Sequence, residues 1–160
     1  MVNERITEEI VRDELRKAGY FKFVYNDIPN IEIYEQKTSN KILENLLDEA
    51  NKNELRKDKG YPDFIIFLQQ YDIVIECKGD RKKHYSQNLD KPKEYAVDGA
   101  IWYSQFFSAR YNTIAIGVSG QNREELRITK YFYKKKKNNK KETGEEKSNK
   151  EKKDKITEPF

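Results

Sequence analysis

The sequence predicts a mixed α/β sheet flanked by helices, and two observations lead to this class. Apolar residues recur at helical spacing in two segments, and a third helical segment is apolar on much of its circumference: residues 7–18, 40–56 and 92–109. Runs of β-branched and aromatic residues lie at 63–68, 72–78, 112–120 and 126–134. The order α, α, β, β, α, β, β is typical of a sheet with helices packed against it.

The first helix is predicted over residues 7–18. Thr7 suits the N-cap position, acidic residues follow it in the first turn, and Gly19 ends the helix. Its apolar face consists of Ile10, Val11, Leu15 and Ala18. Residues 20–25 and 31–34 alternate weakly, and either short strands or extended loop would fit them.

The second helix is predicted over residues 40–56. Its apolar positions are Ile42, Leu43, Leu46, Leu47 and Ala50. The strands 63–68 and 72–78 follow, and the short polar break between them predicts an antiparallel hairpin.

The second half of the chain begins with a polar, basic loop at 79–92. The third helix, 92–109, has Pro92 in its first turn and is expected to be deeply packed. Residues 112–120 predict a buried strand closed by a turn. Residues 126–134 alternate with charges, which predicts an edge strand.

The net charge of +4 belongs to the C-terminal segment 134–160. This segment holds 11 Lys and six acidic residues, a net of +5, which leaves −1 for residues 1–133. Because it has few apolar residues to bury, it is predicted to be a disordered tail behind a folded domain at 1–133. The tail is interpreted as a solvated linker, with a non-specific tether for polyanions as the alternative.

Composition excludes several classes of protein. One cysteine excludes an intrachain disulfide and suits a reducing cytosol, so a cytoplasmic location is expected. No apolar stretch approaches the roughly 20 residues of a membrane span, and no membrane partner is expected. The single His84 has no neighbouring Cys/His cluster, so no zinc site is expected.

Charged residues end the two most apolar strands. Asp63 opens the first strand, and Glu76-Cys77-Lys78 closes the second. In a hairpin Asp63 lies beside Glu76, and Lys78 projects to the same face as Glu76. Two adjacent carboxylates repel unless a cation or proton lies between them, and hard oxygen ligands suit Mg²⁺. Carboxylates, Mg²⁺ and an ammonium group are what phosphodiester hydrolysis requires.

A structural interpretation of the same residues competes with this one. Asp63 could form a turn after Pro62, and Lys78 could pair with Glu76 at a surface strand end. Such triplets are common in a chain with 38% charged residues. The functional interpretation is favoured because these charges end the most apolar strands, where unpaired charge is most costly.

The segment PDFIIF…DIVIECK resembles the Pro-Asp…Glu-x-Lys signature of the PD-(D/E)XK nuclease superfamily. EEIVRDELRKAGY is similar to the opening helix of the nuclease domains of type I and type IIG restriction enzymes. KEYAVDGAIWYSQFF…YNTIAIGVSG resembles segments of restriction enzymes that fuse a nuclease to a methyltransferase. The resemblance covers about residues 5–133 and implies a restriction-endonuclease-like fold.

The resemblance also implies roles for individual residues. The implied metal ligands are Asp63, Glu76 and the backbone carbonyl of Cys77, with Mg²⁺ as the cofactor and Mn²⁺ expected to substitute. Lys78 would orient or activate the attacking water and stabilise developing charge. Glu8 would hold a second metal or a water at the metal, with Glu9 as the alternative.

The region after the second strand departs from the family pattern. Many relatives have Gln four residues before the helix tyrosine, whereas Lys91 precedes Tyr95 here. Tyr95 and Asp98 are therefore interpreted as structural or DNA-positioning. Lys82, Lys83 and His84 could contact phosphates or form a solvated loop. The aromatic residues assigned to the core are Trp102, Phe106 and Phe107; the DNA-binding candidates are Lys82, Lys83 and Tyr95.

The expected function is a Mg²⁺-dependent endonuclease domain of a restriction-modification enzyme that hydrolyses double-stranded DNA to 5′-phosphate and 3′-hydroxyl ends. The chain shows no methyltransferase or helicase motif, so a methyltransferase/recognition or motor domain is expected in a longer chain or a partner subunit. One alternative is a non-catalytic nucleic-acid-binding or scaffolding domain with a nuclease-like fold. Another is a junction resolvase or repair nuclease.

Overall fold

The computed structural model describes residues 2–20, 31–52, 60–68 and 70–137. In chain order its helices and strands are α1 (Glu4–Lys17), β1 (Glu32–Glu35), α2 (Lys41–Lys52), β2 (Phe64–Phe67), β3 (Tyr71–Lys78), α3 (Ala96–Phe107), β4 (Asn112–Ser119) and β5 (Arg127–Tyr133), with a short 3₁₀ turn at Arg81–Lys83. Within these ranges no helix has the length and apolar character needed to cross a bilayer.

The strands form one sheet in the order β1-β2-β3-β4-β5. β3 and β4 are parallel and are joined through α3, whereas the other neighbouring pairs are antiparallel. The mixed α/β class is therefore confirmed. β5 lies at one edge of the sheet, as its alternation with charged residues predicted.

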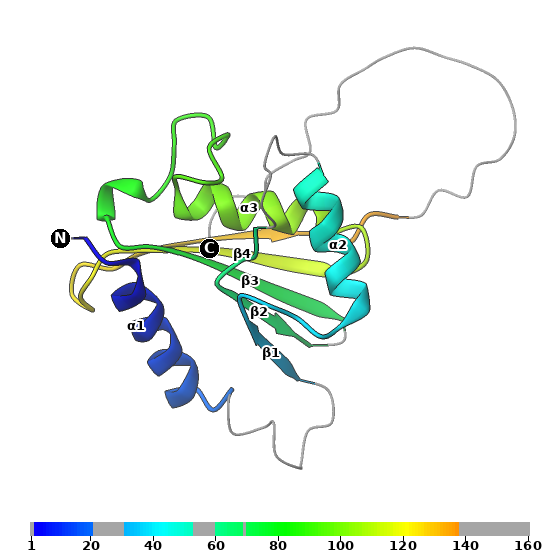
Figure 1. Cartoon of the computed structure of the whole chain (residues 1–160), viewed down its shortest axis with the longest axis horizontal. Coiled ribbons are helices and arrows are strands. Elements are labelled where there is room, and N and C mark those ends of the chain that lie inside the picture. The colour runs from blue at the N-terminus through cyan, green and yellow to red at the C-terminus, as the bar shows by residue number, and fades with distance from the viewer. Residues whose placement is uncertain (1, 21–30, 53–59, 69, 138–160) are drawn as a thin grey trace, which may run out of the picture.

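Helices cover both faces of the sheet, with α1 on one face and α2 and α3 on the other (Figure 1). Phe64 of β2 lies in an apolar cluster with Val11 of α1. Its neighbour Ile65 lies in a second cluster with Leu47 of α2 and Phe107 of α3. The alternation of side chains along β2 explains this division, because successive residues of a strand point to opposite faces.

The first helix begins one turn earlier than predicted. Asn3, not Thr7, is the N-cap residue, and its side chain accepts a hydrogen bond from the backbone N–H of Arg5. Thr7 is instead buried inside the helix and donates its hydroxyl to the backbone oxygen of Gly120 at 2.6 Å. Ala18, expected on the apolar face, is the exposed C-cap residue.

Two further helix predictions need correction. Ile42, expected on the apolar face of α2, is 50% exposed, because the apolar stripe of this helix begins at Leu43. Pro92 lies outside α3, which starts at Ala96 after a turn in which the N–H groups of Glu94 and Tyr95 bond the oxygen of Lys91. The predicted segments at 21–25 and 53–56 lie outside the described residues.

The body of the protein continues past residue 133. The backbone N–H of Lys135 bonds Asn112 Oδ1 at 2.9 Å, and that of Lys136 bonds the oxygen of Ser108 at 2.8 Å. The first lysines of the predicted tail are therefore attached to the end of α3 and the start of β4. The remaining tail, 138–160, lies outside the described residues.

Candidate active site

The β2–β3 hairpin brings two carboxylates together at the ends of its strands. Phe64 lies opposite Ile75, so Asp63, just before β2, falls beside Glu76 near the end of β3. Both side chains are buried. Asp63 Oδ2 accepts the backbone N–H of Cys77 at 2.6 Å, which fixes the carboxylate against the neighbouring strand. The predicted hairpin and the predicted adjacency are both confirmed.

The two carboxylates are electrostatically unfavourable when both are ionised. Burial raises the pKa of Asp63 to about 6, against the lowering effect of its bond from Cys77. Burial, followed by repulsion from Asp63, raises the pKa of Glu76 well above its usual range. A cation placed between these oxygens would offset the loss of hydration and the repulsion between carboxylates that raise these pKa values.

Lys78 ends β3 on the same face as Glu76 but pairs elsewhere. Its Nζ lies 3.0 Å from Oε1 of Glu4, on the first turn of α1. Burial lowers the pKa of Lys78, but Glu76, Glu4 and Asp63 together outweigh it and raise the pKa. Lys78 is therefore a charged ammonium group among carboxylates. It forms its ion pair with Glu4, whereas the structural interpretation of the sequence supposed a pair with Glu76.

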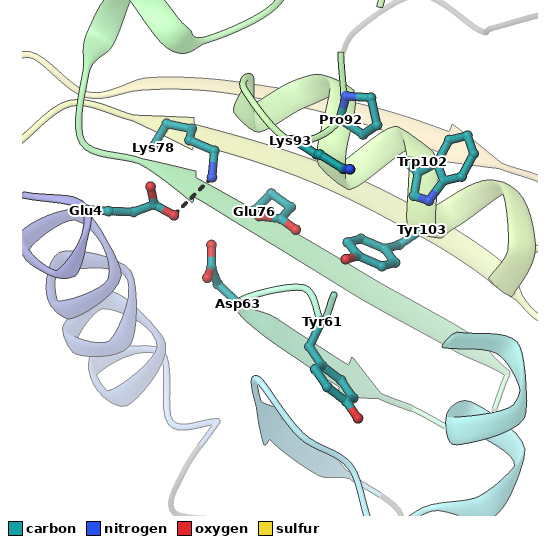
Figure 2. A pocket seen from close by; sticks show the side chains of 9 residues that line it. All are labelled: Glu4, Tyr61, Asp63, Glu76, Lys78, Pro92, Lys93, Trp102 and Tyr103. Carbon is teal, nitrogen blue, oxygen red and sulfur yellow. Dashed lines mark hydrogen bonds and ion pairs between the residues drawn. The ribbon is translucent and has the colours of Figure 1, made fainter. Parts of the chain in front are cut away.

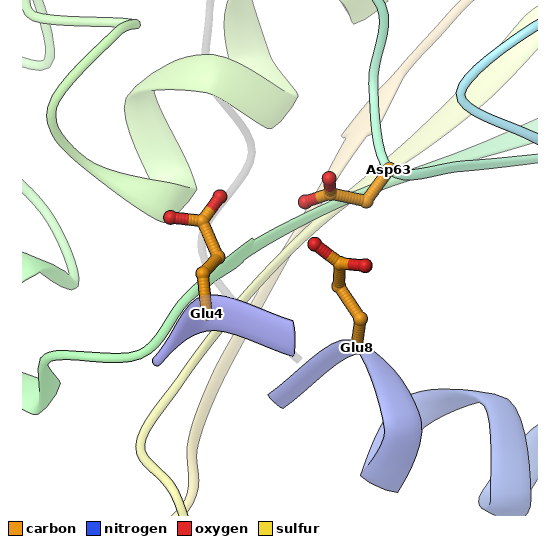
Figure 3. A group of neighbouring side chains, drawn as sticks. All are labelled: Glu4, Glu8 and Asp63. Atoms are coloured by element: carbon orange, nitrogen blue, oxygen red, sulfur yellow. The ribbon is translucent and has the colours of Figure 1, made fainter. Parts of the chain in front are cut away.

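Helix α1 directs Glu8 toward the strand ends. Oxygens of Glu4, Glu8 and Asp63 lie within 4.8 Å of one another (Figure 3). Burial, followed by repulsion from Glu4, raises the pKa of Glu8. Glu9 is exposed and pairs with Arg12, because one residue along a helix rotates the side chain to another face. The sequence left Glu8 and Glu9 as alternatives, and in the structure it is Glu8 that faces Glu4 and Asp63.

Sequence reasoning missed Glu4. The predicted helix began at Thr7, so Glu4 was not placed in the helix. The spacing of Glu4 and Glu8 puts both on one face of α1 once Asn3 is recognised as the N-cap. Asn before a run of helix-forming residues is the signal that could have found it.

A cavity of about 120 Å³ opens between these charged groups and α3. Glu76, Lys78 and Asp63 line one side, and aromatic rings line the other (Figure 2). The lining residues are Glu4, Tyr61, Asp63, Glu76, Lys78, Pro92, Lys93, Trp102 and Tyr103. Trp102 packs against the apolar cluster of α2 and α3, as predicted for a core residue, and also borders this cavity.

The donor set of the site fits a hard divalent cation. The carboxylate oxygens of Glu4, Glu8 and Asp63 lie within 4.8 Å of one another, and Glu76 lies beside Asp63. Oxygen is the ligand atom that Mg²⁺ prefers. The backbone N–H of Cys77 points toward Asp63. Because the N–H and C=O of one strand residue point to the same side of the strand, the Cys77 carbonyl also points to the Asp63 side. The carbonyl of Lys78 faces the opposite side, where it accepts the N–H of Gly120.

Two of the predicted DNA-binding residues lie close together beside the site. The Nζ of Lys83 lies 3.2 Å from Glu94 Oε2 and 5.1 Å from the centre of the Tyr95 ring. Lys83 also borders a second cavity, which shares Glu4, Lys78 and Lys93 with the first. Lys82 is exposed on the 3₁₀ turn. Their contact with DNA stays a prediction.

His84 does not belong to this basic loop, which corrects the sequence interpretation. It is buried, and its two ring nitrogens each lie 2.8 Å from a hydroxyl, Ser119 Oγ and Thr129 Oγ1. Burial, followed by repulsion from Arg127, lowers the pKa of His84 to about 4. The side chain turns into the protein and is not available to a phosphate.

Asp98 organises the loop that precedes α3. It is buried, and its carboxylate accepts the backbone N–H groups of Ser86 and Lys91 at 3.0 and 2.9 Å, together with the Ser86 hydroxyl. These bonds hold the chain that carries Pro92 and Lys93 over the cavity. The geometry agrees with the structural role given to Asp98 from the sequence.

Comparison with known proteins relates the chain to part of a restriction enzyme. In an alignment of 133 positions that covers 75% of the chain, it is 29% identical to the type II restriction enzyme and methyltransferase RM.BcgI of Heyndrickxia coagulans. It spans 19% of the length of that protein. No protein-family model and no solved structure matches the chain. The similarity relates the chain to a segment of a restriction-modification protein, whereas the PD-(D/E)XK assignment depends on the short motifs alone.

Proposed function

We propose that this chain is a Mg²⁺-dependent DNA endonuclease domain of the PD-(D/E)XK type, acting within a restriction-modification enzyme. The observation that carries the proposal is the buried pair Asp63 and Glu76 at adjacent strand ends, with the Lys78 ammonium on the same face. A purely structural cluster would be expected to neutralise its charges internally, but here several carboxylates crowd around the Lys78 ammonium group. The similarity to a restriction enzyme and methyltransferase supports the same assignment.

Asp63 and Glu76 would hold the cation with the Cys77 carbonyl, and Glu8 would supply a further carboxylate from α1. A bound divalent cation would neutralise phosphate charge and lower the pKa of a water molecule. Mn²⁺ is expected to substitute, because it accepts the same oxygen donors.

Lys78 would act on the phosphodiester itself. Its ammonium group is charged and lies beside the carboxylates, so it can hold the attacking water in line and donate to a phosphate oxygen as negative charge develops. Lys82, Lys83 and Tyr95 would hold neighbouring phosphates of duplex DNA, which sets the position of the strand without reading its sequence.

Recognition of a target sequence would come from outside this chain. The chain spans 19% of the restriction enzyme and methyltransferase that it resembles. We propose that a methyltransferase/recognition or motor domain, in a longer chain or a partner subunit, brings this domain to DNA.

A plasmid-nicking assay tests the proposal. Wild type should convert supercoiled plasmid to nicked or linear DNA with Mg²⁺ or Mn²⁺, and EDTA should stop the reaction. Asp63→Ala should lower the rate on the order of a hundredfold or more, since it removes a buried ligand. Asp13→Ala, which removes an aspartate from α1 outside the site, is the matched control and should cleave as wild type does. Equal cleavage by Asp63→Ala and wild type would refute the assignment.

A further inference from the structure

The ion pair between Lys78 and Glu4 joins two elements that are distant in sequence. Lys78 Nζ and Glu4 Oε1 lie 3.0 Å apart, with the Lys78 side chain 17% exposed and the Glu4 side chain 42% exposed. The contact lies where the two cavities meet, since Glu4 and Lys78 line both. A substrate that enters the site would therefore meet this pair.

Glu4 is held in place by contacts of α1 that do not involve the acidic residues. The Thr7 hydroxyl donates to the oxygen of Gly120, and Gln121 Nε2 donates to the oxygen of Asn3 at 3.2 Å. The backbone of Asn3 also packs directly on Gly79, where a Cβ atom would lie 2.9 Å from the Asn3 carbonyl carbon. The first turn of α1 is thus fixed against the end of β3 independently of Glu4.

Lysine needs such a partner more than other catalytic groups do. Its ammonium is a point charge on a flexible four-carbon stem, and it carries three N–H donors. A bond to Glu4 uses one donor and leaves two for a water and a phosphate oxygen. If the ammonium group is fixed before the substrate binds, no side-chain entropy is lost on reaching the transition state. The activation free energy is therefore lower.

We propose that Glu4 is a positioning residue that holds the Lys78 ammonium in the orientation used for phosphodiester hydrolysis. This inference depends on the proposed nuclease function and adds to it a residue that the family signature does not include. The competing role for Glu4 is direct metal binding, because its carboxylate also lies near Glu8 and Asp63. The two roles predict different effects of removing its charge.

The kinetic test uses Glu4→Gln, which keeps the size of the side chain and removes its charge. It should lower kcat about tenfold and leave KM for DNA within about twofold, because Lys78 is displaced while other DNA contacts remain. In a Lys78→Ala background Glu4→Gln should have no further effect on kcat. Glu14→Gln is the matched control: it removes a charge from the same helix, in exposed pairs with Lys17 and Arg123 outside the site.

A second readout needs neither metal nor DNA. Reductive methylation of the metal-free protein, followed by mass spectrometry, measures the reactivity of each lysine. Lys78 should react faster in Glu4→Gln than in wild type, and Glu14→Gln should leave the Lys78 rate unchanged.

The failures of the two proposals are distinguishable. Absence of cleavage by wild type would overturn the nuclease function and the role of Glu4 with it. Cleavage by wild type with unchanged kcat or unchanged Lys78 reactivity in Glu4→Gln would overturn the role of Glu4 alone. A further loss of kcat when Glu4→Gln is added to Lys78→Ala would show that Glu4 does not act through Lys78 and would also overturn the positioning role.

Discussion

Three buried carboxylates of the β2–β3 hairpin have raised pKa values, and their surroundings differ. Asp63 and Glu76 lie beside each other and near a lysine. Asp72 lies at the opposite end of β3, fully buried, and neither of its oxygens has a hydrogen-bond partner among the described residues. At the scale of single residues, the pair lines a cavity beside the Lys78 ammonium group, whereas Asp72 weakens the fold when it is ionised.

Asp72 gives a prediction about stability and pH. Burial raises its pKa from 3.8 to about 7 in the folded protein. The folded state therefore holds the proton more tightly than the unfolded state does. The contribution of Asp72 to the free energy of unfolding is largest below about pH 4 and is lost as the pH rises through about 7. Asp72→Asn should stabilise the protein by about 1–3 kcal/mol at about pH 8 and much less at about pH 5.

Urea denaturation at both pH values measures this difference. The pKa values of Asp63 and Glu76 are also raised, so these groups contribute to the pH dependence of stability in both proteins. Subtracting the free energy of unfolding of wild type from that of Asp72→Asn at each pH cancels their contribution and leaves that of Asp72. A variant that is less stable than wild type at about pH 8 would show that the ionised carboxylate has a stabilising partner.

At the scale of elements, the hairpin and the start of α2 were predictable, whereas the starts of α1 and α3 were not. The strands β2 and β3 carry continuous β-branched and aromatic runs with charges at their ends, and this pattern decided both their pairing and the adjacency of Asp63 to Glu76. The starts of α1 and α3 depend on tertiary contacts as well as on local sequence. Thr7 has the right chemistry for an N-cap, but its hydroxyl bonds Gly120, which is 113 residues away in the chain.

The start of α3 illustrates the same limit. Proline suits the first turn of a helix, so local sequence favours Pro92 there. In the structure Asp98 draws the N–H groups of Ser86 and Lys91 to its carboxylate, which holds the preceding loop in turns until Ala96. Because Lys93 owes its place at the cavity to these contacts, it could not be found from local pattern.

At the scale of the whole molecule, the carboxylate site and the first lysines of the C-terminal segment lie at opposite ends of the sheet. The carboxylate site lies at the end of β3, whereas Lys134–Lys137 leave β5 beside the start of β4, as the orange end of the chain in Figure 1 shows. An eight-residue strand separates the two by on the order of 20 Å. These four lysines carry +4, and residues 138–160, with seven Lys and six acidic residues, carry only +1.

This distribution predicts which lysines supply non-specific attraction to DNA. Replacing Lys134, Lys135, Lys136 and Lys137 by serine should make the dependence of log K on log salt shallower, by about 0.9 for each DNA phosphate that the variant no longer neutralises. Truncation after Lys137 should change the slope much less, since it removes little net charge. Fluorescence anisotropy with a short duplex over a range of NaCl concentrations measures both, and a larger effect from the truncation would contradict the assignment.

Melting with and without Mg²⁺ tests most directly whether Asp63 and Glu76 are brought together to bind a cation. Asp63→Asn keeps an oxygen for the N–H of Cys77 and removes one charge of the pair. Without metal it should melt at or above the temperature of wild type, because repulsion is relieved. Mg²⁺ at ten times Kd should stabilise wild type by about 1.4 kcal/mol and the variant far less. A metal-free variant that melts well below wild type, or a wild type that Mg²⁺ leaves unchanged at millimolar concentration, would contradict the claim.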